Sequence, residues 1–172
     1  VWVTTPKVSE KSATVSVDVV LRDGSSEGLK AEISVLSRGG REAATAKGDF
    51  AGGKLKASLK IGSPALWSPE TPNLYTLRTR LIKNGKTVDE NLTRFGIRSI
   101  SFTKEKGFQL NGKTRKFKGV CLHHDLGPLG AAVNEAAIAR QIKIMKDMGC
   151  DAIRTSHNMP STMMMDLCDS LG

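Results

Sequence analysis

The chain has 172 residues, of which 39% are hydrophobic and 25% charged, as expected for an ordinary globular protein of one large or two small domains. Its net charge of +9 comes from scattered Lys and Arg residues, and only 5% of residues are aromatic, which argues against a nucleic-acid-binding protein. A helix that spans a membrane needs about 18 or more consecutive apolar residues. The sequence has no such run, so we expect no membrane partner.

The three cysteines are Cys121, Cys150 and Cys168. An odd number without paired spacing does not predict a disulfide framework. Because Cys121 lies in a strand-like run and Cys150 precedes another, we predict that both are small buried apolar residues.

Residues 1–99 show the period-two pattern of β-strands. In Ala13–Leu21 hydrophobic residues alternate with polar ones, which predicts one buried and one solvated face. Asn84-Gly85 predicts a hairpin between the last two strand-like runs. Short strands bounded by Gly, Ser or Pro indicate an immunoglobulin-like β-sandwich. After Ala13–Leu21, the runs are 31–35, 43–46, 55–61, 74–82 and 87–93.

Trp67 and Glu70 lie in a proline-rich connection between strands. An aromatic ring can stack on a sugar, but we favour a structural role in which Trp67 anchors the connection onto the sandwich or the next domain. We interpret Glu70 as a surface group in a turn.

Two strand-like segments lead out of the sandwich. Residues 95–102 are predicted to form the exit strand, and Asn111-Gly112 predicts a hairpin between 108–113 and 115–118. We therefore place a sandwich domain at residues 1–99 and a second domain at residues 100–172.

Residues 117–156 have the pattern of a strand–helix–strand unit. A short apolar run ends at Leu122, an amphipathic helix is predicted from Asn134, and Gly149 is a typical helix stop. Residues 151–155 form the second apolar run. Strands joined by a helix in this way are parallel, and α/β proteins place their chemistry at the carboxyl ends of such strands.

Polar residues follow both strands. His123, His124 and Asp125 follow the first, and Arg154, Ser156, His157 and Asn158 end the second. We therefore expect the two groups to meet in space. A second helix is predicted from Ser161, in which the methionines of 163–165 are more typical of core packing than of a metal or cofactor site.

Three motifs in this half are long enough to be specific: GVCLHHD (119–125), MKDMGCDAIRTSHN (145–158) and DLCDSLG (166–172). They resemble the opening of the catalytic barrel of glycoside hydrolase family 2, which includes β-galactosidases, β-glucuronidases and β-mannosidases. The β-galactosidases are the most similar. Upstream, LWSPETPNLY (66–75) and FGIR (95–98) resemble the domain that precedes this barrel. The resemblance covers nearly the whole chain, with departures at Asp151, where the family usually has Asn, and at Met159, where Pro is common.

The resemblance implies an immunoglobulin-like sandwich followed by the first two βα units of a (β/α)8 TIM barrel. A complete barrel has eight units and about 250 residues. We therefore expect a fragment of a larger retaining exo-β-glycosidase, with a β-galactosidase acting on terminal β-linked galactose as the first choice. A β-glucuronidase or a β-mannosidase is the alternative within the family.

Retaining hydrolysis needs two carboxyl groups about 5 Å apart. The family takes both glutamates from later barrel strands, so we expect no catalytic residue, cofactor or metal in this chain and no activity from it alone. Asn134-Glu135 imitates the Asn-Glu that carries the family's acid/base. Its place at the start of a helix instead predicts a helix cap and a favourable charge at the helix dipole.

The motif match implies that His123 and His157 hydrogen-bond sugar hydroxyls, and we add Arg154 and Asn158 as candidate substrate-binding residues. Arg154 is expected to extend toward the pocket floor and to pair with an acidic group. Asn158 donates to a hydroxyl or fixes its loop, and these alternatives stay open. For His124 and Asp125 we favour a loop-capping role over one that orients His123.

Two other classes of function stay open. His123, His124, Asp125 and His157 could bind a metal, although zinc needs three or four convergent ligands and adjacent histidines point to opposite sides of a strand. The other is a non-catalytic carbohydrate-binding or spacer module based on the sandwich. In either case a partial barrel has open strand edges, so we expect the chain to self-associate through its incomplete barrel.

Overall fold

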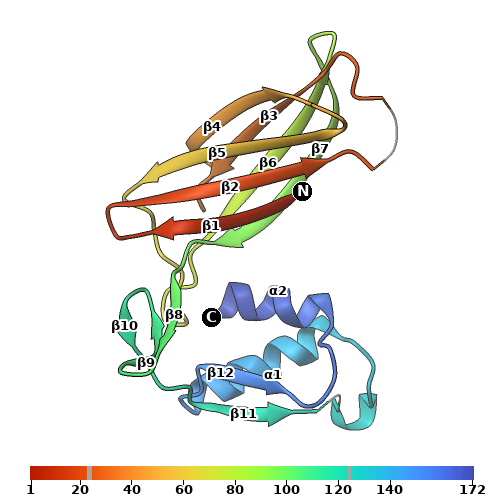
Figure 1. Ribbon diagram of the computed structural model, residues 1–172. Coiled ribbons are helices and arrows are strands. Elements are labelled where there is room, and N and C mark those ends of the chain that lie inside the picture. The colour runs from red at the N-terminus through yellow and green to blue at the C-terminus, as the bar shows by residue number, and fades with distance from the viewer. Residues whose placement is uncertain (23–24, 124) are drawn as a thin grey trace. The chain divides into compact units, whose positions relative to one another are not determined.

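The computed structural model describes residues 1–22, 25–123 and 125–172, which form two compact units (Figure 1). The first unit comprises Val1–Trp67 and Asn73–Ile100, and the second comprises Ser68–Pro72 and Ser101–Gly172. The short loop Ser68–Pro72 is therefore part of the second unit, although the residues on both sides of it belong to the first.

The described part of the first unit is a sandwich of two antiparallel sheets, with strand orders β1-β2-β5 and β4-β3-β6-β7 (Figure 1). The predicted immunoglobulin-like sandwich is confirmed. One strand, β1, lies outside the runs singled out above, because Pro6 interrupts its alternation and its ladder with β2 breaks between Thr4 and Lys7. The strands are β1 (Trp2–Val8), β2 (Ser12–Val20), β3 (Leu29–Leu36), β4 (Glu42–Asp49), β5 (Lys54–Gly62), β6 (Leu74–Lys83) and β7 (Lys86–Gly96).

The core of the sandwich follows from the alternation. Every second residue of β2 is buried, and the residues between them are partly exposed. Burying one Val, Leu or Ile side chain contributes about 1.5–3 kcal/mol, so this row alone commits β2 to one register. The fully buried residues of largest volume are Val15, Val17, Ile33, Val35, Leu77 and Ile97.

Both Asn-Gly pairs form tight turns, as predicted. Asn84 and Gly85 have φ of 51° and 75°, and Asn111 and Gly112 have φ of 52° and 76°. Positive φ at both central residues matches the twist of a two-residue hairpin. In the second hairpin, β9 (Gly107–Leu110) pairs with β10 (Lys113–Thr114). The partner strand predicted at 115–118 is wrong, although the Arg115 N–H still donates to the Phe108 carbonyl at 3.0 Å.

Residues 95–102 are not one strand, so this prediction is wrong. β7 ends at Gly96, and β8 (Ile100–Thr103) is hydrogen-bonded to β9 instead. Between them Ile97 is fully buried, and its carbonyl accepts the Trp67 N–H at 2.8 Å. Trp67 is buried against Gly96, and the Arg98 guanidinium lies 4.6 Å from its ring centre. The structural role predicted for Trp67 is confirmed within the sandwich.

The described part of the second unit contains the predicted strand–helix–strand pattern. β11 (Gly119–Leu122) and β12 (Ala152–Thr155) are parallel, with α1 (Glu135–Asp147) between them in sequence. A 3₁₀ turn, Gly127–Leu129, precedes α1, and α2 (Thr162–Leu171) follows β12. Neither helix is long and apolar enough to cross a membrane.

Both helices begin, and α1 also ends, as the sequence predicts. The Asn134 and Ser161 side chains accept the N–H groups of the third helical residues of α1 and α2. Gly149 has φ of 90° and closes α1: its N–H donates to the carbonyl of Lys146, while the Cys150 N–H donates to that of Met145.

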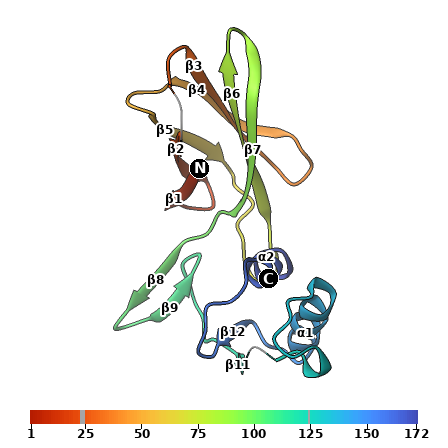
Figure 2. The ribbon, with the colours of Figure 1, turned by 90° about the vertical axis from the view of Figure 1, so that its right-hand side faces the viewer.

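The two helices cover one face of the β11–β12 pair (Figure 2). Val120 and Leu122 pack there against the helical core. Because strand residues alternate between faces, Cys121 lies on the other face and is exposed. The prediction that Cys121 is buried is therefore wrong, whereas Cys150 is half-buried and packs against the helical core. The buried helical residues are Ile138, Ile142, Met145 and Met164.

Gly119→Ala should open the β11–β12 pair, because a Cβ on Gly119 would lie 2.2 Å from the carbonyl oxygen of Ala152. That atom is backbone, so we expect a loss of about 3 kcal/mol, the upper end of ordinary overpacking. Helical ellipticity at 222 nm reports this unit, since α1 and α2 are both in it. Gly62→Ala, which meets nothing within 4 Å, is the matched control. Equal urea midpoints for the two variants would contradict this account.

Candidate functional site

A pocket lies at the carboxyl ends of β11 and β12. Its apolar wall comes from Leu122, Leu126, Val133, Ile138 and Met164, which link the strand ends to the starts of both helices. Its polar groups lie mainly in the segments that follow the strands, as parallel strands dictate. The polar lining residues are His123, Asp125, Gln141, Thr155, Ser156, Asn158 and Ser161.

The two groups of polar residues meet, as predicted. The His123 and His157 ring centres are 5.9 Å apart, with an angle of 87° between the rings. Both side chains are exposed, so each imidazole has edge atoms free for a ligand. A neutral imidazole offers one donor and one acceptor, a combination that suits a sugar hydroxyl.

Arg154 contacts the residues that follow it on its own strand. Its Nη1 donates to Ser156 Oγ at 3.0 Å, and its Nη2 lies 3.4 Å from His157 Nδ1. A guanidinium can only donate, so Nδ1 accepts and the proton of a neutral His157 sits on Nε2. In the described part of the chain Arg154 has these partners rather than the predicted carboxylate. The strand alternation explains this, because residues two apart share a face.

Ser156 is buried and connects the end of β12 to β11. The Ser156 N–H donates to the Leu122 carbonyl at 3.0 Å, which continues the strand pairing toward the pocket. Hydrogen bonds from Ser156 and then from Arg154 hold the pKa of the Cys121 thiol below its usual range. Cys121, Arg154 and Ser156 therefore form one polar contact row on the face that the helices leave open.

The other predicted positions have simpler roles. Asp125 Oδ1 accepts the Gly127 N–H at 2.8 Å, so it caps its loop as predicted. His124 lies outside the described residues. Asn158 is exposed at the pocket, and both of its predicted roles stay predictions. Glu135 lies in the first turn of α1, and the Asn134 side chain caps that turn, as expected for a helix start.

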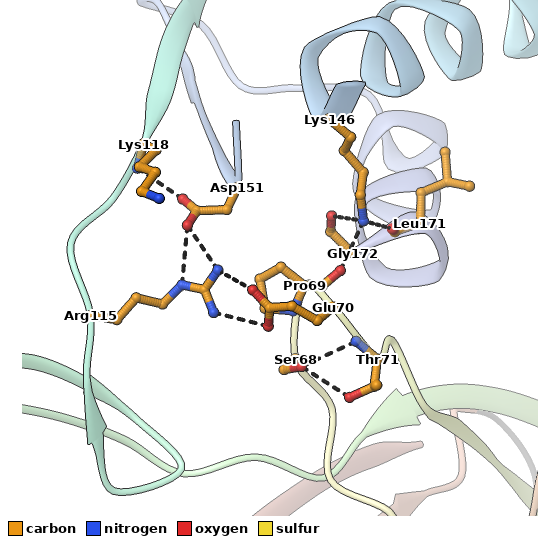
Figure 3. Close-up of polar contacts among 10 residues, drawn as sticks. All are labelled: Ser68, Pro69, Glu70, Thr71, Arg115, Lys118, Lys146, Asp151, Leu171 and Gly172. Atoms are coloured by element: carbon orange, nitrogen blue, oxygen red, sulfur yellow. Dashed lines mark hydrogen bonds and ion pairs between the residues drawn. The ribbon is translucent and has the colours of Figure 1, made fainter. Parts of the chain in front are cut away.

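A second polar cluster lies at the amino ends of the same strands and was not predicted from the sequence. Glu70, interpreted above as a turn residue on the surface, makes a two-pronged ion pair with Arg115, which also binds Asp151 (Figure 3). Glu70 is an exposed group in a turn, as interpreted above, but its ion pair with Arg115 was not predicted. The partners are 45 and 36 positions apart in the sequence, and no periodic pattern connects residues at such separations. The one sequence feature that pointed to this cluster was Asp151, which stands where the family usually has Asn.

Comparison with known proteins identifies the family. Residues 1–98 match the family model described as glycosyl hydrolases family 2, and residues 101–172 match the model of the TIM barrel domain of that family. The chain belongs to glycosyl hydrolases family 2. The family and the fold predicted from the motifs, a sandwich followed by the start of a TIM barrel, are both confirmed.

Individual family 2 relatives resemble the chain over its full length. It is 43% identical to β-galactosidase BoGH2A of Bacteroides ovatus, over 99% of this chain and 21% of that protein. It is 37% identical to a putative β-glucuronidase of Formosa agariphila, over 100% of this chain and 16% of that one. The crystal structure of a family 2 member from Bacteroides cellulosilyticus superposes with a TM-score of 0.94 at 36% identity, over 99% of this chain and 24% of that one.

These relatives carry more than one activity name. A structure of Bifidobacterium dentium β-glucuronidase complexed with coumarin-3-O-glucuronide also superposes, with a TM-score of 0.90 at 26% identity, over 97% of this chain and 28% of that one. The chain thus spans about a fifth of the length of the first two curated relatives. These similarities show the family of the chain, but they do not show which sugar it recognises.

Proposed function

We propose that this chain supplies the sandwich and the first two barrel units of a retaining exo-β-glycosidase. In this proposal His123 and His157 hold the terminal sugar at the carboxyl ends of β11 and β12. The observation that carries it is the pair of exposed imidazoles, 5.9 Å apart, which follow two different strands; His123 lines the pocket, and His157 lies between the pocket residues Ser156 and Asn158. Family membership supplies the reaction class, since glycoside hydrolysis is what the names of its relatives describe.

The roles of the residues follow from their contacts. His157 donates its Nε2–H to a sugar oxygen, because Arg154 occupies Nδ1. Arg154 therefore acts through His157, and Asn158 supplies an amide at the same rim. Such contacts orient the substrate and strengthen in the transition state, whereas the bond-breaking carboxyl pair comes from barrel strands beyond those described.

We further propose that the sugar is a β-galactoside rather than a β-glucuronide. A glucuronide carries a carboxylate, which a site usually binds with Arg or Lys. Among the described residues that line the pocket, there is neither an Arg nor a Lys, and the Arg154 guanidinium beside His157 already contacts Ser156 and His157. A neutral hexose needs only hydroxyl partners, which His123, Asn158 and Gln141 provide. The β-glucuronidase and β-mannosidase alternatives are tested by comparing the three substrates.

The full-length gene product should hydrolyse a nitrophenyl β-galactoside with a higher kcat/KM than the matching β-glucuronide and β-mannoside. A higher value for the glucuronide would overturn the choice of sugar and leave the reaction class intact. A folded full-length protein that turns over none of the three would contradict the proposed function. The self-association expected of the isolated chain stays a prediction, which its mass in dilute solution would test.

A further inference from the structure

The loop Ser68–Pro72 is bound to the amino ends of β11 and β12 by one arginine (Figure 3). The Arg115 guanidinium donates Nη1 to Glu70 Oε2 at 3.0 Å and Nη2 to the other oxygen. Its Nε and Nη2 also donate to Asp151 Oδ2, at 3.2 and 2.8 Å. We call Glu70, Arg115 and Asp151 the amino-end cluster.

Asp151 connects the amino-end cluster to both strands. Its Oδ1 accepts the Lys118 N–H at 2.8 Å, and its own N–H donates to the Lys118 carbonyl at 2.7 Å. Lys118 immediately precedes β11, and Asp151 immediately precedes β12. This two-bond clasp therefore sets the register at which the parallel pair begins, Gly119 opposite Ala152.

A second cation holds the same loop from the helical side. The Lys146 ammonium, on α1, donates to the backbone oxygens of Pro69 and Gly172 at 2.8 Å each, and to that of Leu171 (Figure 3). The carbonyls at the end of α2 carry the negative end of its dipole, which favours a cation there. A Cβ on Gly172 would lie 2.3 Å from the Pro69 oxygen, so the loop packs closely on this helix end.

Burial and charge indicate that the amino-end cluster is more than a surface ion pair. The side chains of Asp151 and Arg115 are 12% and 23% exposed, whereas Glu70 is 62% exposed. Burial opposes ionisation of Asp151, but the Lys118 N–H and then Arg115 outweigh it and lower the pKa of its carboxyl. A buried carboxylate that loses its cation is left uncompensated, so the cluster acts as a unit.

We propose that Arg115 and Asp151 are positioning residues for the sugar site, which they fix through β11 and β12. This inference rests on the proposed function. Each strand has four residues, or about 13 Å of rigid backbone. At their far ends His123 follows β11 directly, and His157 follows β12 after Ser156. A shift in the pairing of β11 and β12 at their amino ends should therefore change the distance between the two imidazoles. A one-residue slip would even turn every strand residue to the opposite face.

The competing account is that the amino-end cluster only stabilises the fold, as the amino-terminal face of a barrel commonly does. Histidine NMR on the 172-residue chain separates the two accounts without any activity. We expect Arg115→Met and Asp151→Asn to shift the imidazole signals of His123 and His157 at a temperature where the variants are folded. Arg115→Lys should restore part of the shift. Unchanged imidazole signals with only a lowered Tm would overturn the proposal.

Arg80→Met is the matched control, because Arg80 pairs with Glu90 at 2.6 Å between two strands of the sandwich. It removes an arginine ion pair elsewhere and should leave both imidazole signals in place. If Arg115→Met does not fold, Glu70→Gln makes the same comparison at the most exposed member of the cluster. Imidazole signals that stay unchanged in Glu70→Gln would then overturn the proposal.

Kinetics of the full-length gene product give the second readout. Misplacing binding groups by about 1 Å can cost 10²-fold, so we expect kcat/KM to fall about tenfold or more in Arg115→Met, with partial rescue in Arg115→Lys and the parental value in Arg80→Met. A parental kcat/KM in folded Arg115→Met would overturn the positioning role. Absence of any turnover in the parent would instead count against the proposed function, and the NMR comparison would still decide this inference.

The pH dependence provides a further check. Hydrogen bonds from Arg115 lower the pKa of Glu70 from 4.5 to about 2. A lowered folded pKa means that this stabilisation is complete above pH 4.5 and is lost as the pH falls through about 2. The helical signal of the parent should therefore resist urea more than that of Glu70→Gln at pH 5, and this difference should vanish near pH 2. A difference that is independent of pH would show that Glu70 does not act through its charge.

Discussion

The 172-residue chain alone should hydrolyse no β-glycoside, and its rate on a nitrophenyl β-galactoside should equal that of buffer. Glycoside hydrolysis needs an acid/base and a second carboxyl group on opposite sides of the bond, about 5 Å or 6.5–9.5 Å apart. Among the described residues that line the pocket, Asp125 is the only carboxylate, and it already accepts the Gly127 N–H. His123 and His157 can orient a sugar but cannot replace the missing pair.

Glu135 is the residue that tests this expectation most directly, since Asn134-Glu135 imitates a catalytic dipeptide. In the structure Glu135 begins α1, where a negative charge favours the helix dipole. Circular dichroism should first show that the chain is folded. Turnover that Glu135→Gln abolishes would then contradict both the expected inactivity and the structural role of this residue. Turnover that survives Glu135→Gln would point to a contaminating enzyme.

The features that the sequence predicted well are those with a local chemical cause. Asn84-Gly85 and Asn111-Gly112 form the predicted turns because both residues tolerate positive φ. Asn134 begins a helix because its side chain replaces a missing backbone acceptor. The meeting of the two histidines also followed from a local fact, since each comes within two residues of the end of a strand of one parallel pair.

The features that were missed depend on contacts between distant segments. Glu70 reads as a turn residue until Arg115, 45 positions later, comes within hydrogen-bonding distance. Nothing in the spacing of charges along the chain predicts that a proline-rich loop joins the second unit. Residues 95–102 alternate like a strand, but burial of Ile97 in the sandwich ends the pairing at Gly96.

One error and one untested expectation at the site have the same background in strand geometry. The pairing of Arg154 with a carboxylate stays a prediction; among the described residues its guanidinium donates to Ser156, two residues on and on the same face. Cys121 was expected in the core, yet Val120 and Leu122 take the helical face and leave it on the other. Successive residues of a strand point to opposite faces. In a strand that helices cover on only one side, this alternation decides whether a side chain is buried more than its polarity does.

His157→Phe should strongly lower the kcat/KM of the full-length enzyme and should leave its thermal stability nearly unchanged. The side chain is exposed, and phenylalanine keeps the ring while it removes both nitrogens. With Nδ1 facing Arg154, the lost group is the Nε2–H that we propose donates to a sugar oxygen. A donor that acts mainly in the transition state is worth about 2–4 kcal/mol, as at an oxyanion site. We therefore expect kcat/KM to fall by about 30-fold to 10³-fold.

Whether the substitution lowers kcat or raises KM shows which role His157 has. A fall mainly in kcat indicates a bond made in the transition state, whereas a rise in KM alone indicates uniform binding of the sugar. Met159→Leu is the matched control, because Met159 lies two residues away, is 87% exposed and should keep parental kinetics. Thermal unfolding of both variants should match the parent. If His157→Phe hydrolyses the best substrate at the parental rate, His157 has no role in catalysis and its assignment to the sugar site fails.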